Sequence, residues 1–575
     1  MGNKNNRFNN KFQKKGFSKG KFEKSDKFSK FEKFVNKAAE SVEIKDINQD
    51  FFNQNVEVSG LIEQVTQTGG PTIFVVSDGT ATLALKGFVG QGQRAYPEID
   101  MGDTIKAVVT INEYNGELEG EIEKIEKLNP EEHKVYLEKI IHLQKKRAEV
   151  KEIDFLVKSE IIEKLKPLII KAAFEIRLAI IQNRPIIIRH HNDTDGYCAG
   201  YALEKAILPL IEKEHGSEKA GYEFFMRSPC QAPFYEIDDS IRDTANSLRN
   251  VAKFSNKMPL VIITDNGSTP EDLFGIKQGK VHGIEFIVID HHFFDTEDNI
   301  SSVCSNQKGN QKFEHHDVIS REVLTHVNPF LVGEDGSKFS AGMLGAELAR
   351  FINNVQGLEV LPAIAGLADR VDITNPELIK EYVKIAEKEG YTKELLVNIS
   401  KVIDFVSAKV RFMEVREYIG VIFGEPRHKQ KELVSLMAPY IIGLEEKGLL
   451  IAKSNTDVEK IGKTTLQLLD IENTFPGFGF YPKPGKCVGM VHDDLQKTHG
   501  VNNLVTAGLM RTAITIRATD DSNFSMHELI SYLNKHTPNS FVEGGGHKNA
   551  GSITFLPNKQ EEILELMKKF ILARQ

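Results

Sequence analysis

Three short apolar segments in the middle of the chain are each followed by aspartate and histidine residues. The segments and the residues after them are 185–190 with His191, Asp193 and Asp195, 260–264 with Asp265, and 285–289 with Asp290, His291 and His292. Apolar runs of this length that alternate with helical stretches are typical of strands buried in a parallel sheet. Because sites in such sheets form beyond the carboxyl ends of the strands, we expect these side chains to meet at one edge.

A metal site is the physical interpretation of this pattern. Carboxylates that gather without a cation repel one another, and their pKa values rise. Divalent ions remove that conflict. A mixed set of histidine and aspartate suits manganese, magnesium or zinc, with manganese well matched to nitrogen and oxygen ligands. A single aspartate at a strand end is more often a turn or a helix cap, but three strands that deliver the same residue types favour metal binding.

Residues 45–129 have the pattern of a small β-barrel. Apolar and polar residues alternate at 56–62, a second strand is expected at 72–76, and a third unit at 103–112 leads to Asn115-Gly116, which is typical of a tight hairpin turn. This succession of strands and turns resembles the OB-fold, a five-stranded barrel that binds nucleic acid. A small barrel of another kind that binds protein is the alternative.

The first 44 residues differ in composition from the rest of the chain. Basic residues are interleaved with seven phenylalanines and no aliphatic run could form a core, so we expect a disordered tail. Through Lys37 this tail has twelve basic and three acidic residues, a charge of +9, whereas the whole 575-residue chain carries −8. Cations beside aromatic rings suit single-stranded nucleic acid. A solubilising tail without a specific partner is the alternative.

Helical spacing predicts a linker at 130–183 and a connector between two lobes at 376–461, with a catalytic domain at 184–375 between them. A last domain is expected at 462–575. Its predicted elements are strands at 466–471, 487–491 and 513–517 and helices at 526–535 and 560–573.

The cysteine content and the hydropathy pattern indicate the cellular compartment in which the protein is expected. The four cysteines have no CxxC spacing, which argues against a disulfide framework or a cysteine zinc site and favours the cytoplasm. No apolar run reaches the length of about 18 residues that a membrane-spanning helix needs, so no membrane partner is expected.

Four ordered motifs carry a resemblance to a known family. HNDTDG at 191–196, ITDNGS at 263–268, VIDHH at 288–292 and GLADR at 366–370 resemble the motifs of the DHH phosphoesterase superfamily. GGGHKNAGS at 544–552 resembles the signature of the DHH-associated C-terminal domain. With the barrel, the whole chain resembles an archaeal-type RecJ-like single-strand exonuclease. The implied fold is multidomain: an OB-fold barrel, an α/β DHH domain with a parallel sheet, a helical connector and an α/β DHH-associated domain.

The resemblance also implies roles for particular residues. The implied metal ligands are His191 and Asp193 on one ion, Asp195, Asp369 and His291 on the other, and Asp265 between the two. His292 would contact the scissile phosphate, and Asp290 would orient the histidine pair. Bacterial RecJ-like proteins usually have aspartate at the position of His191, a difference that keeps a ligand but bears on the preferred metal.

A substrate-binding group is implied in the last domain. Gly544, Gly545 and Gly546 would let backbone N–H groups approach a phosphate closely. His547 would hydrogen-bond that phosphate, and Arg517 would add a bidentate contact.

The predicted activity is two-metal hydrolysis of phosphodiester bonds in single-stranded DNA or RNA, with a 5′→3′ direction implied by the resemblance. Two divalent ions are expected as cofactors, manganese first and magnesium as the alternative, and replication or repair proteins are expected as further partners. A phosphoesterase of small substrates (oligonucleotides, cyclic dinucleotides or pyrophosphate) and a non-catalytic replication scaffold stay open. The barrel and the tail count against the first of these, and the filled ligand positions count against the second.

Overall fold

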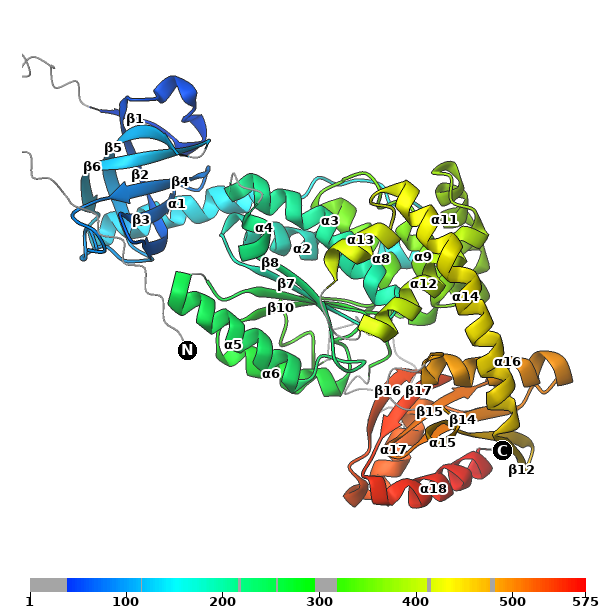
Figure 1. The fold of residues 1–575 in the computed structure, drawn as a ribbon. Helices are drawn as coiled ribbons and strands as arrows, with labels where there is room; N and C mark the ends of the chain where they lie inside the picture. The colour runs from blue at the N-terminus through cyan, green and yellow to red at the C-terminus, as the bar shows by residue number, and fades with distance from the viewer. Residues whose placement is uncertain are drawn as a thin grey trace, which may run out of the picture.

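A computed structural model describes residues 39–114, 116–215, 219–254, 257–294, 318–410, 415–475 and 481–574. Figure 1 shows a barrel (blue) and a C-terminal lobe (orange to red) at opposite ends of a central α/β domain. The multidomain fold class expected from the sequence is confirmed. Among the described residues, no helix combines the length and apolar character that a membrane crossing needs.

The N-terminal unit is a closed five-stranded β-barrel. Its strands are β2 (Asn55–Gln67), β3 (Thr72–Ser77), β4 (Thr82–Gly87), β5 (Thr104–Tyr114) and β6 (Glu117–Lys127). They pair in the order β2-β3-β4-β6-β5, and pairing of β2 with β5 closes the barrel. Alternate residues of the strands point inward, so that Val58, Phe74 and Leu85 share a core. The expected OB-type barrel is thereby confirmed.

The barrel includes residues that the sequence pattern assigned to the tail. β1 (Glu40–Ser41) pairs in parallel with β2, and Ile44, in a 3-10 helix (Ile44–Asp46), is buried in the barrel core. Another 3-10 helix (Gln49–Phe51) leads into β2. The apolar side chains of Val42 and Ile44 pack on the barrel, and this unit therefore starts before residue 45. Residues 1–38 of the tail predicted at 1–44 lie outside the described residues.

Two helices join the barrel to the central domain. α1 (Pro130–Ala148) begins with a capping box, in which Asn129 Oδ1 accepts from the Glu132 N–H and the Glu132 carboxylate accepts from the Asn129 N–H. α2 (Glu160–Ile181) buries an apolar face that includes Ile169 and Ile176 against the central core.

The central domain has a five-stranded parallel sheet in the order β11-β10-β9-β7-β8. Its strands are β7 (Ile186–His190), β8 (Phe225–Pro229), β9 (Leu260–Thr264), β10 (Glu285–Ile289) and β11 (Thr325–Val327). Its helices are α3 (Thr194–His215), α4 (Ala220–Glu223), α5 (Ile237–Phe254), α6 (Pro270–Val281), α8 (Ala341–Ile352), α9 (Leu361–Ala368) and α10 (Val371–Thr374), with 3-10 turns at Pro329–Val332 and Gly336–Lys338. β7, β9 and β10 are the three strands that the apolar segments predict.

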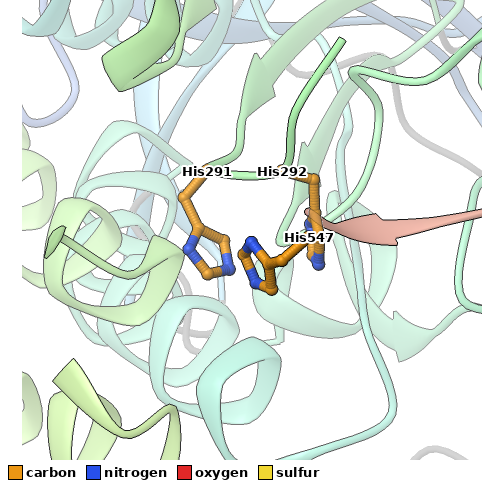
Figure 2. A group of neighbouring side chains, drawn as sticks. All are labelled: His291, His292 and His547. Carbon is orange, nitrogen blue, oxygen red and sulfur yellow. The ribbon is translucent and has the colours of Figure 1, made fainter. Parts of the chain in front are cut away.

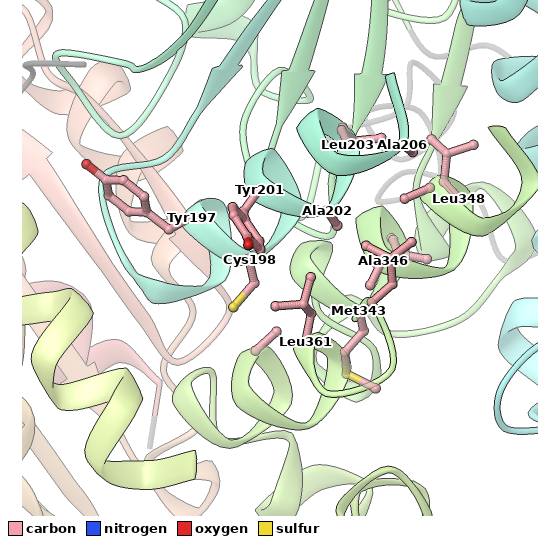
Figure 3. Packing of buried hydrophobic residues seen from close by; sticks show 14 of the residues in the cluster. Tyr197, Cys198, Tyr201, Ala202, Leu203, Ala206, Met343, Ala346, Leu348 and Leu361 are labelled. Atoms are coloured by element: carbon pink, nitrogen blue, oxygen red, sulfur yellow. The ribbon is translucent and has the colours of Figure 1, made fainter. Parts of the chain in front are cut away.

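The helix that follows β7 is held by close packing. Figure 3 shows α3 lying against α8 and α9, with small side chains such as Ala202 and Ala346 between the larger ones. At Gly345, a Cβ atom would lie 2.8 Å from the Cα of Ala199, so only glycine lets the two helices approach this closely. This packing fixes the start of α3, which carries Asp195.

A set of helices connects the central domain to the C-terminal lobe. They are α11 (Pro376–Lys388), α12 (Lys393–Val410), α13 (Arg416–Ile422) and α14 (Arg427–Ser454). β12 (Thr456–Ile461) follows and pairs with β13 (Thr464–Asp470), the next strand of the lobe. The lobe therefore starts inside the stretch that the sequence assigned to the connector, which was set at 376–461.

The C-terminal lobe has a mixed six-stranded sheet in the order β12-β13-β14-β15-β17-β16. Its remaining strands are β13 (Thr464–Asp470), β14 (Leu504–Met510), β15 (Ala513–Ala518), β16 (Glu543–His547) and β17 (Ala550–Thr554). Its helices are α15 (Ile471–Thr474), α16 (Pro484–His499), α17 (Met526–His536) and α18 (Gln560–Ala573), with 3-10 turns at Asp520–Ser522, Pro538–Ser540 and Pro557–Lys559.

One predicted strand of this lobe, at 487–491, is wrong. The segment lies in α16, which has Pro484 at its first turn. Cys487, Val488 and Val491 are buried on one face of this helix, against Leu469 and Ile471. Their apolar side chains fit a helix face as well as a strand, and the sequence alone did not separate the two.

Candidate metal and phosphate site

The expected side chains meet at the carboxyl edge of the central sheet. His191 follows β7, Asp265 follows β9, and Asp290, His291 and His292 follow β10. Asp265 has a φ of 56°, a left-handed conformation that a non-glycine residue seldom adopts. Strained backbone of this kind is found preferentially at functional sites.

Three groups of potential metal ligands contain Asp265: one joins it to Asp290 and His292, and the other two meet at its two carboxylate oxygens. In one group, His191 Nδ1 lies 3.0 Å from Asp193 Oδ2 and 3.5 Å from Asp265 Oδ2. In the other, His291 Nε2 lies 3.3 Å from Asp265 Oδ1 and 4.0 Å from Asp195 Oδ2. Asp265 Oδ2 is buried and has no hydrogen-bond partner among the described residues.

Asp195 is held in place from α8. Its Oδ1 accepts a hydrogen bond from the Ser340 hydroxyl at 2.6 Å, and its Oδ2 accepts from the Gly342 N–H at 3.0 Å. A Cβ on Gly342 would lie 2.7 Å from Asp195 Oδ1, so the close approach depends on glycine here. Ser340 and Gly342 were not predicted as part of the site, because nothing local in their sequence connects them to Asp195.

His291 is oriented by the backbone. Its Nδ1 lies 3.1 Å from the Gly336 carbonyl oxygen, so that Nδ1–H donates there and Nε2 faces the carboxylates. Asp369, which follows α9, has Oδ2 3.7 Å from the same Nδ1. Asp369 thus lies beside His291 but belongs to none of the three groups that contain Asp265.

The electrostatics of the cluster fit a bound cation. Burial raises the pKa of Asp195 well above its usual value, and the neighbouring Asp265 and Asp369 raise it further. Burial also raises the pKa of Asp369. For His291, burial lowers the pKa, but Asp369 and Asp265 outweigh burial and hold it well above the usual value. A divalent ion would relieve this crowding of carboxylates and satisfy the unpartnered oxygen of Asp265.

Asp290 organises the histidine pair. Its Oδ1 accepts from the His291 N–H at 2.8 Å and lies 2.8 Å from His292 Nδ1, while its Oδ2 accepts from the Ser268 N–H at 3.2 Å. Burial would raise the pKa of Asp290, but His292 outweighs burial and keeps it below its usual value. Because Nδ1 of His292 is engaged by Asp290, the ring nitrogen left for another contact is Nε2.

The C-terminal lobe brings His547 to this pair. Figure 2 shows the rings of His291, His292 and His547 gathered together, with His547 arriving from the other lobe. Its ring centroid lies 4.8 Å from that of His291 and 4.9 Å from that of His292. Burial lowers the pKa of His547 well below its usual value, as do the charges of His291 and His292.

The three glycines before His547 lie in strand β16. Among the described residues β16 is an edge strand that pairs only with β17, so the backbone N–H groups on its other side are not taken up by a neighbouring strand. The Gly544 N–H lies 3.4 Å from Glu271 Oε1 of the central domain, so this strand faces the other lobe. Gly545 lies between the other two glycines. Gly546 has a φ of 130°, which residues other than glycine rarely adopt.

Two arginines lie near Asp369. Arg517, on β15, is partly buried, and burial together with the nearby Arg370 lowers its pKa. Arg370 follows Asp369 directly and forms an ion pair with Asp493 of α16, with Nη2 3.1 Å from Oδ2. The sequence implied a role for Arg517 but none for Arg370, the last residue of the GLADR motif, whose neighbour Asp493 comes from the other lobe.

A lysine that the sequence did not single out connects the lobes at the first motif. Lys483 Nζ donates to the Asn192 carbonyl oxygen at 2.6 Å and to the Ser407 hydroxyl at 2.8 Å. Asp404, also on α12, accepts from the Thr194 hydroxyl at 2.7 Å. Connector, C-terminal lobe and first motif are thus joined by hydrogen bonds at the site. Lysines are abundant in this chain, so no local signal marks Lys483.

Comparisons with known proteins agree with this geometry. No family model matches the chain. An uncharacterized protein of Methanocaldococcus jannaschii is 35% identical over 549 residues, which cover 91% of this chain and 70% of that protein. A solved structure described as the DHH domain of a member of the s1p family of ribosomal proteins is 35% identical, has a TM-score of 0.69, and covers 78% of this chain and 100% of its own.

A second solved structure is RecJ from Thermus thermophilus in complex with Mn²⁺, which is 16% identical with a TM-score of 0.47 and covers 72% of this chain and 55% of its own. Membership of the family follows from the 35% identity to the solved DHH domain over its full length, and from the four motifs and the cluster they form. This chain belongs to the DHH family of phosphoesterases.

Proposed function

We propose that the chain is a metal-dependent exonuclease that hydrolyses single-stranded DNA or RNA, in the 5′→3′ direction that its resemblance to RecJ-like enzymes implies. The observation that carries the proposal is Asp265, a buried carboxylate that joins the ligand group of His191 to that of His291, with Oδ2 making no hydrogen bond among the described residues. This arrangement suits a pair of divalent ions that share one bridging carboxylate.

The ligands in this proposal come from three strand ends and two helix ends. They are His191, Asp193 and Asp265 for one ion, and Asp195, Asp265, His291 and Asp369 for the other. Manganese or magnesium, when bound, would lower the pKa of a water molecule enough to supply hydroxide near neutral pH.

The chain's own residues would hold the phosphodiester for attack. His292, whose Nδ1–H donates to Asp290, would in its protonated form donate from Nε2 to a phosphate oxygen. His547 would donate to the same phosphate from the opposite lobe, and those N–H groups of the glycine strand 544–546 that neither β17 nor Glu271 engages would add donors. Arg517 would contribute charge to a phosphate that lies near Asp369.

End-labelled single strands test the proposal. DNA and RNA strands labelled at either end are incubated with manganese or magnesium, and the products are followed in time. We expect stepwise shortening from the 5′ end, loss of all cleavage in chelator, and loss in Asp193→Ala and His291→Ala with strand binding largely retained. Cleavage only of short oligonucleotides or cyclic dinucleotides would support the small-substrate phosphoesterase instead. A folded protein without turnover on any phosphodiester would support the scaffold.

A further inference from the structure

Aromatic side chains continue the site beyond the histidines. Phe293 directly follows His292, and its ring centroid lies 4.2 Å from that of His527 and 5.3 Å from that of Phe330. Phe293 and Phe330 are both partly exposed. His527 lies in the first turn of α17, in the C-terminal lobe, so that these aromatic rings come from both lobes, as do the histidines.

One ring nitrogen of His527 is available for a hydrogen bond. Its Nε2 is buried and has no hydrogen-bond partner among the described residues. Burial lowers the pKa of His527 to about 4, and the nearby His292 lowers it as well, so the ring is neutral near pH 7. A neutral imidazole can either donate or accept a hydrogen bond at Nε2, and a buried nitrogen without a partner is unfavourable until a ligand supplies one.

We propose that Phe293, Phe330 and His527 form a nucleobase seat next to the phosphate-binding histidines. The base of the nucleotide at the reacting phosphate would stack on the exposed parts of the two phenylalanines and hydrogen-bond to His527 Nε2. Stacking is tolerant of sequence because every base has a flat π-face, which suits an enzyme that shortens strands of any sequence. The inference rests on the proposed function and deepens it: the substrate is recognised by base as well as phosphate.

The position of the seat relative to the histidines supports this assignment. His292 and Phe293 are consecutive residues, so a group that bonds to one is within a nucleotide's reach of the other. Pyrophosphate carries no base and would gain nothing from these rings. The seat therefore favours a nucleic-acid strand over a base-free phosphate among the substrates considered.

An abasic substrate tests the seat directly. Two end-labelled single strands carry a tetrahydrofuran residue in place of the terminal nucleoside, one at the 5′ end and one at the 3′ end, and are compared with the intact strand in manganese. We expect kcat/KM for the wild-type protein to fall roughly 10-fold on the strand whose reacting nucleotide lacks its base. In Phe293→Leu the intact strand should be cleaved about as slowly as the abasic one, so that the difference disappears.

Matched variants separate stacking from a structural role. His527→Leu should lose part of the discrimination, and His527→Gln, which places an amide nitrogen near the position of Nε2, should restore it. Phe274→Leu makes the same substitution at a phenylalanine of α6 that is 69% exposed, and should leave the discrimination unchanged. Binding of intact and abasic strands to Asp265→Asn, measured by fluorescence anisotropy, gives a readout that does not require turnover.

The outcomes distinguish the seat from the proposed function. Equal cleavage of intact and abasic strands by the wild-type protein would overturn the seat and leave the exonuclease proposal intact. An equal loss on both strands in Phe293→Leu would assign Phe293 to packing between the lobes and also overturn it. No cleavage of any strand by the wild-type protein would overturn the proposed function and the seat together.

Discussion

The barrel and the site between the lobes differ in charge, although a nucleic-acid strand was expected to contact both. From residue 39 to residue 129 the barrel has sixteen aspartates and glutamates against six lysines and arginines. Four of the exposed acids, Glu117, Glu121, Glu123 and Glu126, lie on the single strand β6. At the site, by contrast, Lys483, Arg517 and His547 lie near Asp193, Asp369 and Asp290 respectively, and Arg370 directly follows Asp369.

The two regions also lie at opposite ends of the central sheet. Lys257, just before β9, forms an ion pair with Glu63 of the barrel, and Arg147 pairs with Glu214 at the end of α3. The barrel therefore rests near the amino ends of the strands, whereas the ligands follow their carboxyl ends (Figure 1). A fold that often binds nucleic acid does not by itself make this barrel a strand-binding surface, because binding depends on the side chains it carries.

The largest expected effect on cleavage is that of substituting Asp265, the carboxylate shared by the two proposed metal sites. Asp265→Asn should lower manganese-dependent cleavage more than about 1000-fold, because it removes the one residue common to both groups of ligands. End-labelled strands measure the loss, and thermal unfolding checks that the variant folds. Asp50→Asn, an exposed aspartate of the barrel, is the matched control and should cleave at the wild-type rate. Activity retained in Asp265→Asn would contradict the assignment of Asp265 as a metal ligand.

The next effect is expected at the histidine from the other lobe. His547→Ala should lower kcat/KM roughly 100-fold, since in the proposed mechanism its ring donates a hydrogen bond to the phosphate. His499→Ala, at the exposed end of α16, should have no effect. If both variants cleave alike, the C-terminal lobe does not contribute to the reaction through His547.

A third prediction concerns the pH dependence of stability that His215, near the barrel, should cause. His215 stacks on Phe224 with ring centroids 3.9 Å apart, beside Glu63 and Lys257, and burial lowers its pKa to about 4. Because the folded pKa lies below the unfolded value of about 6.5, the unfolded chain takes up a proton first as the pH falls. The contribution of His215 to stability is complete above about pH 6.5 and is lost progressively toward pH 4.

Between pH 7 and pH 5 this loss should be about 2 kcal/mol in the free energy of unfolding. Denaturant unfolding at the two pH values measures it. His215→Gln should reduce the pH dependence by about this amount, whereas His142→Gln, on the exposed face of α1, should not. An unchanged pH profile in His215→Gln would mean that this ring titrates normally.

A smaller effect is expected from the basic tail. Removing residues 1–38, which leaves β1 in place, should weaken strand binding roughly 10-fold at low salt and flatten its salt dependence, by about 0.7 in log–log slope for each phosphate that the tail no longer neutralises. Fluorescence anisotropy over a salt series measures both quantities. The same slope with and without the tail would show that its lysines do not bind phosphates.

The smallest effect is expected at the acidic strand of the barrel. Changing Glu117, Glu121, Glu123 and Glu126 to glutamine should alter strand affinity less than about twofold at 0.15 M salt, where exposed charges are screened beyond roughly 8 Å. Marked tightening in the same anisotropy assay would place the strand near the barrel and would break the contrast between the two regions.

Much of the site could be predicted from local sequence. An apolar run followed by Asp265, or by Asp290, His291 and His292, predicts both a buried strand and a polar edge, and β9 and β10 have the predicted bounds. The segment at 487–491 could not be assigned correctly because its apolar residues fit either type of element. In α16 they pack against Leu469 and Ile471, and this packing exists only in the folded lobe.

The sequence by itself determined the residue types, the strand ends and the family motifs, because each of these is a local pattern. Only the tertiary structure decided which residues meet: Ser340 with Asp195, Lys483 with Asn192, and His547 with His292. These pairs come from distant parts of the chain. They are brought together by the packing of α3 on α8 and by the position of the C-terminal lobe, which depend on many weak interactions that no single motif encodes.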